Sequence, residues 1–71
     1  MTKADREMWA EAYRLHDKYQ NMTGSDEEWT ACANECAAVC DKYNNSSLIM
    51  GLIQAVYAEL EKMVNKKKDA A

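Results

Sequence analysis

This chain contains no proline and only two glycines among its 71 residues. Proline and glycine most often interrupt helices, so their scarcity lets helical patterns run long. The chain also lacks any run approaching the roughly 20 apolar residues of a membrane span, and its charged start, MTKADRE, lacks the apolar stretch of a signal peptide. We therefore expect a cytoplasmic protein that does not bind membranes.

Few residues are available to build a core. A chain of this length buries roughly 60% of the surface that its unfolded form exposes, so residues 1–71 are expected to form a single domain. At that size, burial of apolar area barely offsets a conformational entropy cost of roughly 1.5 kcal/mol per ordered residue. The core must therefore be efficient, or part of it must be shared with a second molecule.

Two breaks divide the helical pattern. Gly24 can adopt the left-handed conformation that ends a helix, and Ser25 with Glu28 forms the S-x-x-E capping box that begins the next one. The polar cluster at residues 44–47 supplies asparagines to end that helix and serines to cap a third. The pattern predicts an all-α fold, a three-helix bundle with helices at about residues 3–22, 26–43 and 47–65 and a charged, frayed tail at 66–71.

The first helix has a wide apolar face. Thr2 and Asp5 resemble a capping box at its start. Apolar residues then recur at three- and four-residue steps, at Met8, Ala12, Leu15, Tyr19 and Met22. Beside this stripe, at most about 100° round the helix from its centre, lie Trp9, Tyr13 and His16.

The second helix has a slim apolar face of small side chains between two aromatic ones. Its members are Trp29, Cys32, Ala33, Cys36, Ala37, Cys40 and Tyr43. Small side chains allow a neighbouring helix to approach closely. We therefore expect the bulky Trp9, Tyr13 and Tyr19 of the first helix to pack against this face.

The three cysteines of that face are candidate ligands for a metal ion, with His16 as a further ligand. A four-residue step rises about 6 Å, so Cys32 and Cys40 lie about 12 Å apart along the helix axis. One tetrahedral zinc ion, with Zn–S distances near about 2.3 Å, cannot bind both, and two thiols with His16 leave the site a ligand short. We expect Cys32, Cys36 and Cys40 to be free thiols that pack as small hydrophobes, without a metal or cofactor; a small metal or redox protein is the alternative.

The third helix has more apolar residues than one stripe can hold. A helix that is apolar all round is either central in its fold or covered by a second molecule, and three short helices enclose none of their number. Gly51, Ala55 and Ala58 also form a row of small residues that permits close approach. We predict an intermolecular contact, with another protein or with a second copy in a homo-oligomer, at Leu48, Met50, Gly51, Ala55, Tyr57 and Ala58.

Negative charge is concentrated in the second helix of this chain, whose net charge is −3. The acidic residues are Asp26, Glu27, Glu28, Glu35 and Asp41. An acidic chain is a poor candidate for binding a phosphate backbone, so we do not expect nucleic acid as a partner. The same face supports a different hypothesis, an acidic inhibitor that mimics nucleic acid and occupies a basic groove.

One motif in the first helix and one in the third resemble sequences of other proteins. The first helix contains W-x3-Y-x-L-x-x-K-Y, formed by Trp9, Tyr13, Leu15, Lys18 and Tyr19. The third contains A-V-x-x-E-L-E, formed by Ala55, Val56, Glu59, Leu60 and Glu61. Together they resemble small uncharacterised helical proteins encoded by phages and conjugative elements of Firmicutes. The resemblance implies a bacterial or phage protein of a kind that blocks host complexes by binding them.

The chain has no motif that predicts catalysis. It lacks a glycine-rich phosphate loop, and none of its serines or cysteines lies in a nucleophile elbow or triad pattern. We therefore expect a non-enzymatic protein-interaction module that self-associates or binds a protein partner through the third helix. The acidic inhibitor and the metal or redox protein are the alternatives.

Overall fold

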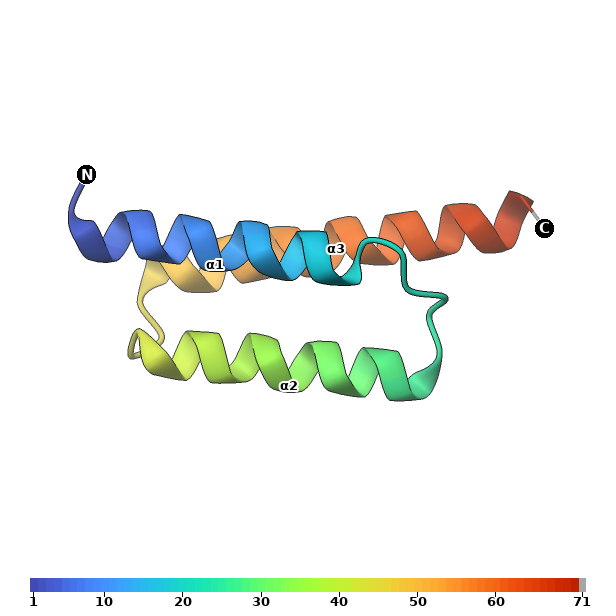
Figure 1. Ribbon diagram of the computed structural model, residues 1–71, viewed down its shortest axis with the longest axis horizontal. Coiled ribbons are helices and arrows are strands. Elements are labelled where there is room, and N and C mark those ends of the chain that lie inside the picture. The colour runs from blue at the N-terminus through green and yellow to red at the C-terminus, as the bar shows by residue number, and fades with distance from the viewer. Residues whose placement is uncertain (71) are drawn as a thin grey trace.

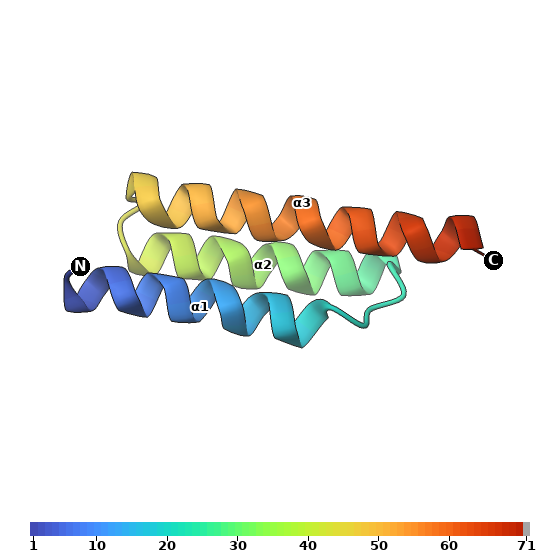
Figure 2. The same ribbon diagram turned by 90° about the horizontal axis from the view of Figure 1, so that it is seen from above.

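The computed structural model describes the backbone of residues 1–70 and the side chains of residues 1–68. Its three helices are α1 (Lys3–Tyr19), α2 (Asp26–Lys42) and α3 (Ser47–Ala70). Each helix contacts both others, and α1 with α3 is the most closely packed pair. In Figures 1 and 2, α1 and α3 run side by side in the same direction, and α2 runs the opposite way beneath them. The predicted all-α three-helix bundle is confirmed.

Local hydrogen bonds begin the first two helices where the sequence predicts. Thr2 Oγ1 accepts from the Asp5 backbone N–H at 3.1 Å, and the Asp5 carboxylate accepts from the Thr2 N–H at 3.3 Å. At α2, Ser25 Oγ accepts from the Glu28 N–H at 3.2 Å. Both pairs are complete capping boxes, which satisfy backbone donors that a helix start leaves without partners.

Glu28 binds more of the chain than a capping box requires. Its Oε1 accepts hydrogen bonds from the backbone N–H groups of Thr23, Gly24 and Ser25, each at 3.1 Å. The Thr23 hydroxyl donates a further bond at 2.6 Å. These donors, led by the Thr23 side chain and the Ser25 N–H, lower the pKa of Glu28 to about 2. One carboxylate thus holds the second half of the connection between α1 and α2, residues 23–25.

The far ends of α1 and α3 differ from the predicted ones. α1 ends at Tyr19, three residues before the predicted 22, although Met22 is still buried. α3 continues through Ala70, five residues beyond its predicted end at 65, so residues 66–70 of the predicted tail are helical; residue 71 lies outside the described residues. No proline or glycine follows residue 65 to stop the helix. Lysines near a helix C-terminus also interact favourably with its dipole.

A side chain of α3 reaches the end of α1. Lys67 Nζ donates to the backbone oxygen of Gln20 at 3.3 Å and to that of Met22 at 3.5 Å. Both carbonyls lie just beyond the last turn of α1, where backbone acceptors lack helical partners. The extra length of α3 therefore helps to cap α1.

The connection between α2 and α3 uses two left-handed residues, Asn44 (φ 56°) and Asn45 (φ 54°). Asparagine adopts this conformation more readily than most residues. The Asn45 N–H donates to Cys40 O at 2.8 Å, which closes the end of α2. Ser46 then caps α3, because its hydroxyl oxygen accepts from the Ile49 N–H at 3.5 Å, while its backbone oxygen accepts from the Met50 N–H at 3.0 Å.

The core lies along the meeting line of the three helices. The largest fully buried side chains are Leu15, Ile49, Leu60 and Cys32. Val39, which lay outside the predicted face of α2, is buried, whereas Ala33 and Ala37 are exposed. The prediction for those two alanines was therefore wrong, and α2 is rotated toward Val39 relative to it.

Gly24 and Gly51 should respond in opposite ways to alanine. Gly24 has φ +92°, and an added Cβ would overlap Val64 Cγ1, so Gly24→Ala should lower the free energy of unfolding by more than about 1 kcal/mol. Gly51 lies within α3 with no atom within 4 Å of an added Cβ, so Gly51→Ala should raise it by roughly 0.5–1 kcal/mol. Urea unfolding followed by circular dichroism measures both. Changes of the same sign would contradict this account.

Stability should depend on pH through Glu28. Folding lowers the pKa of this carboxyl from 4.5 to about 2, so its contribution is present above pH 4.5 and is lost as the pH falls toward 2. NMR titration should place the Glu28 midpoint near pH 2. Glu28→Gln should flatten the decline of the thermal midpoint in this window, whereas Glu27→Gln, at an exposed neighbour, should not. An identical decline in both variants would rule out the Glu28 mechanism.

Candidate functional site

An apolar groove of about 400 Å³ lies between α1 and α3. We call it the α1–α3 groove. Side chains at three- and four-residue steps form each wall, because such steps place residues on one side of a helix. The α1 wall comprises Trp9, Ala12, Tyr13 and His16, and the α3 wall comprises Leu52, Ala55, Val56 and Glu59.

The groove faces away from α2. On α1, Glu11 and Lys18 form ion pairs with α2, Glu11 with Lys42 at 3.6 Å and Lys18 with Glu35. At about 100° per residue, Trp9 and Tyr13 lie on the opposite side of α1 from those two residues. Since α2 covers one side of the α1–α3 pair, this opposite side remains open.

The α1 wall leaves large aromatic surface in solvent. Trp9 is 49% exposed and Tyr13 is 74% exposed, whereas Tyr19 is 9% exposed. The expectation that all three pack against the slim face of α2 was therefore wrong for Trp9 and Tyr13. Their position beside the stripe of α1 was visible in the sequence, but periodicity alone does not tell which flank of a wide apolar face meets a neighbour.

The predicted contact residues of α3 do not form one surface. Ala55 lines the α1–α3 groove, and Gly51 and Ala58 are exposed on α3. Leu48 is half-buried and packs against the core. Met50 is 39% exposed. The prediction missed Trp9, Tyr13 and His16, which supply the α1 wall.

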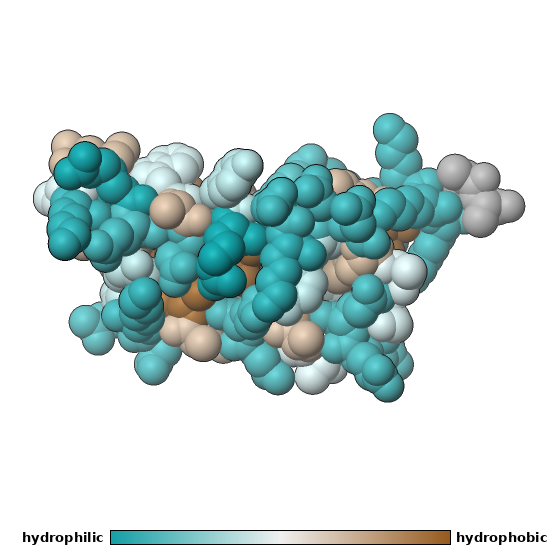
Figure 3. Space-filling view, viewed as in Figure 1, coloured by the Kyte–Doolittle hydropathy of each residue, from teal (hydrophilic) through white to brown (hydrophobic). Residues whose placement is uncertain are grey.

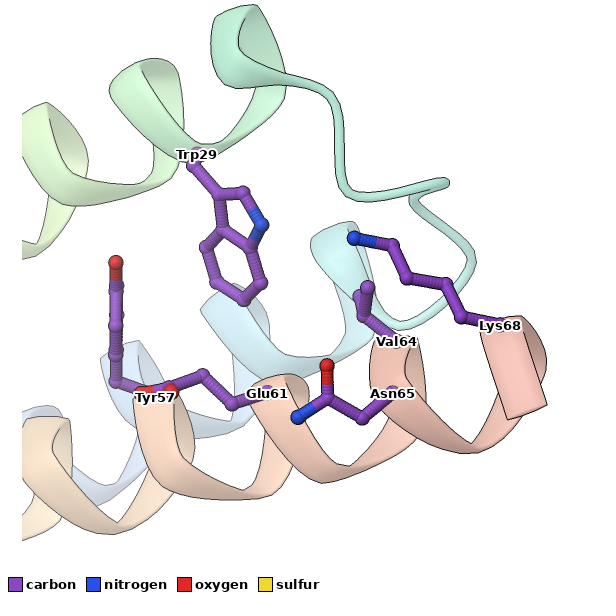
Figure 4. A pocket seen from close by; sticks show the side chains of 6 residues that line it. All are labelled: Trp29, Tyr57, Glu61, Val64, Asn65 and Lys68. Atoms are coloured by element: carbon purple, nitrogen blue, oxygen red, sulfur yellow. The ribbon is translucent and has the colours of Figure 1, made fainter.

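Tyr57 faces α2 and is not free for the predicted contact. Its ring packs against Trp29, with centroids 5.1 Å apart and planes tilted by 47°. The two rings border a cleft of about 270 Å³ whose remaining lining is mostly polar (Figure 4). Because the rings touch each other, they leave no slot between them for a flat or cationic ligand. This cleft is a packing feature of the α2–α3 end.

The three thiols are buried on α2. Cys32 is fully buried, and Cys36 and Cys40 are 6% and 8% exposed. Burial raises the pKa of all three, that of Cys36 to about 12. His16 lines the α1–α3 groove, which faces away from α2. Among residues 1–68, no group of three or more histidine, cysteine, aspartate or glutamate side chains is placed to hold a metal ion.

The acidic residues of α2 are divided between two roles. Asp26, Glu27 and Asp41 are exposed. Glu28 binds the connection that precedes α2, and Glu35 pairs with Lys18 of α1, whose hydrogen bond lowers the pKa of Glu35. Two of the five predicted carboxylates are therefore engaged in contacts within the chain, and three are free of them among the described contacts.

The side of the molecule in Figure 3 is mainly hydrophilic, and strongly hydrophobic residues show mainly in the seam between α2 and the other two helices. Within the described part of the chain, none of the helices is both long enough and apolar enough to cross a membrane.

Comparisons with protein-family models, with curated proteins and with solved structures found no match. The resemblance to small phage and mobile-element proteins therefore stays a prediction.

The thiols should react slowly while the protein is folded. A pKa near 12 for Cys36, against an ordinary value of 9, leaves on the order of 10³-fold less thiolate, which is the reactive form. Pulse labelling with iodoacetamide at pH 8, read by peptide mass spectrometry, should modify Cys36 only after urea is added. A chelator should leave the thermal midpoint unchanged. Rapid labelling of the folded protein, or a lower thermal midpoint with chelator, would instead support a metal or redox protein.

Proposed function

We propose that this chain is a non-enzymatic protein-interaction module that binds a helix of a protein partner, or of a second copy, across the α1–α3 groove. The observation that carries the proposal is the aromatic wall of that groove, with Tyr13 74% exposed and Trp9 49% exposed. Tryptophan and tyrosine are enriched among the residues that supply most of the binding energy at protein interfaces. Burying them against a partner would remove this apolar surface from water.

The shape of the groove favours a helical partner. Figure 2 looks onto α1 and α3 lying side by side, and a third helix can lie along the furrow between two such helices, as in helix-in-groove recognition. Leu52, Val56 and Ala55 supply an apolar floor and wall. His16 and Glu59 add the polar groups that can orient a partner at one end.

The alternatives have weaker support. A nucleic-acid mimic needs a continuous set of free carboxylates, but Glu28 and Glu35 are engaged within the chain. A metal or redox protein needs accessible, ionisable thiols, but Cys36 is buried with a raised pKa. We therefore propose the interaction module as the function.

Cross-linking from the groove tests the proposal. Tyr13 is replaced by the photoreactive residue benzoylphenylalanine, and the matched control carries the same residue at Ala38, exposed on α2. In an extract of the cells that produce the protein, irradiation should yield a discrete adduct from position 13, with another protein or with a second copy, and none from position 38. Equal yields from both positions, or none from either, would contradict the proposal.

A stability measurement accompanies the cross-linking test. Tyr13→Ala should change the free energy of unfolding by less than about 0.5 kcal/mol, because substitutions of exposed side chains usually have effects of that size. Leu15→Ala, at a fully buried neighbour, should cost roughly 2–5 kcal/mol. Urea unfolding measures both. A large loss with Tyr13→Ala would mean that this side chain supports the fold instead of a partner.

A further inference from the structure

We propose that the occupant of the α1–α3 groove is a second copy of this chain, in a two-fold dimer whose axis runs parallel to the helices. This inference rests on the proposed function and names its partner. In this arrangement α1 of each copy lies across α3 of the other. Shape, charge and area on this face carry the argument.

The face is complementary to itself in shape. Trp9 and Tyr13 form a row of bulky side chains along α1, and Gly51 with Ala55 forms a low row along α3. The rows lie at the same height, because Trp9 and Tyr13 line the same groove as Ala55. A two-fold axis parallel to both rows places each copy's aromatic row on the other's low row. An axis perpendicular to the helices would instead oppose the two aromatic rows.

The charges beside the two rows also match. Asp17 is exposed on α1, one turn beyond Tyr13, and Lys62 is exposed on α3, two turns beyond Ala55. Helical side chains lean toward the helix N-terminus, so the long Lys62 side chain points back toward the level of Asp17. In the parallel dimer, Asp17 of one copy therefore meets Lys62 of the other. Arg6 falls opposite uncharged residues near Gly51. Glu59 lines the groove and approaches its counterpart near the axis, where Lys62 of its own helix, 3.9 Å away, partly offsets its charge.

The available area fits a weak dimer. The shorter helix, α1, has 17 residues, which corresponds to a length of about 26 Å, and two adjacent helices are about 20 Å wide. Their face offers about 500 Å² in projection per copy, or about 1,000 Å² in a dimer. That total lies at the lower limit for specific interfaces. A dimer in exchange with monomer over the micromolar range is therefore expected.

Sedimentation velocity across that range tests the inference on the full chain. The mass should rise with concentration from 8.1 kDa toward twice that value. Ala55→Glu, which places a charge in the low row, should raise the dimer dissociation constant more than about tenfold, whereas the control Ala38→Glu on α2 should leave it within about twofold. Circular dichroism confirms that both variants are folded.

Charge exchange tests the parallel arrangement. Asp17→Lys and Lys62→Asp should each weaken dimerisation several-fold, and the double variant should recover most of the loss. If Arg6→Asp, and not Lys62→Asp, restored the dimerisation of the Asp17→Lys variant, the axis would be perpendicular to the helices and the proposal would be overturned. A dimer that Ala55→Glu leaves intact would overturn it as well. A strictly monomeric wild type would also overturn it. In that case, a position-13 adduct with another protein would leave the proposed function standing, and the absence of any adduct would remove both.

Discussion

The side-by-side contact of α1 and α3 determines what the rest of the molecule can do. Leu15, Ile49 and Leu60 are fully buried along this contact and the adjoining seam with α2. One further helix can cover one side of such a pair, and α2 occupies that side. The opposite side is left without a cover for geometric reasons, so apolar residues of α1 and α3 that lie on it must face water. Tyr13 and half of Trp9 do so.

The buried side chains of α2 are small enough to fit the narrow space against α1 and α3. Cys32, Cys36 and Cys40 give α2 buried groups that are small and, with raised pKa values, stay neutral, so they need no ionic partner in the core. Carboxylates of the same helix stay at its edges, where Glu28 caps its start and Glu35 pairs with Lys18. This separation keeps the carboxylates of an acidic helix at its edges while it packs against two others, although Glu35 Oε2 is buried without a hydrogen-bond partner among the described residues.

The sequence predicted what depends on neighbouring residues and missed what depends on how helices rotate against one another. Ser25 with Glu28 and the asparagines before Ser46 mark helix boundaries through contacts a few residues apart, and those boundaries were right within a residue. The exposure of Trp9 depends instead on which flank of a wide apolar face turns toward α2, and periodicity is the same for either flank. The end of α3 was missed because its anchor, Lys67 on the carbonyl of Gln20, joins residues 47 positions apart.

Exposed aromatic surface on so small a protein has an energetic meaning. Burial of the exposed half of Trp9 would contribute on the order of 2–3 kcal/mol at about 25 cal/mol per Å², a large fraction of the stability expected of a domain this size. The bundle does not capture this contribution, because no fourth helix is present in the described residues to cover the groove. Any partner that covers it binds the folded chain and stabilises it by mass action. Binding then raises the apparent stability of the folded chain, by an amount that grows with the concentration of the partner.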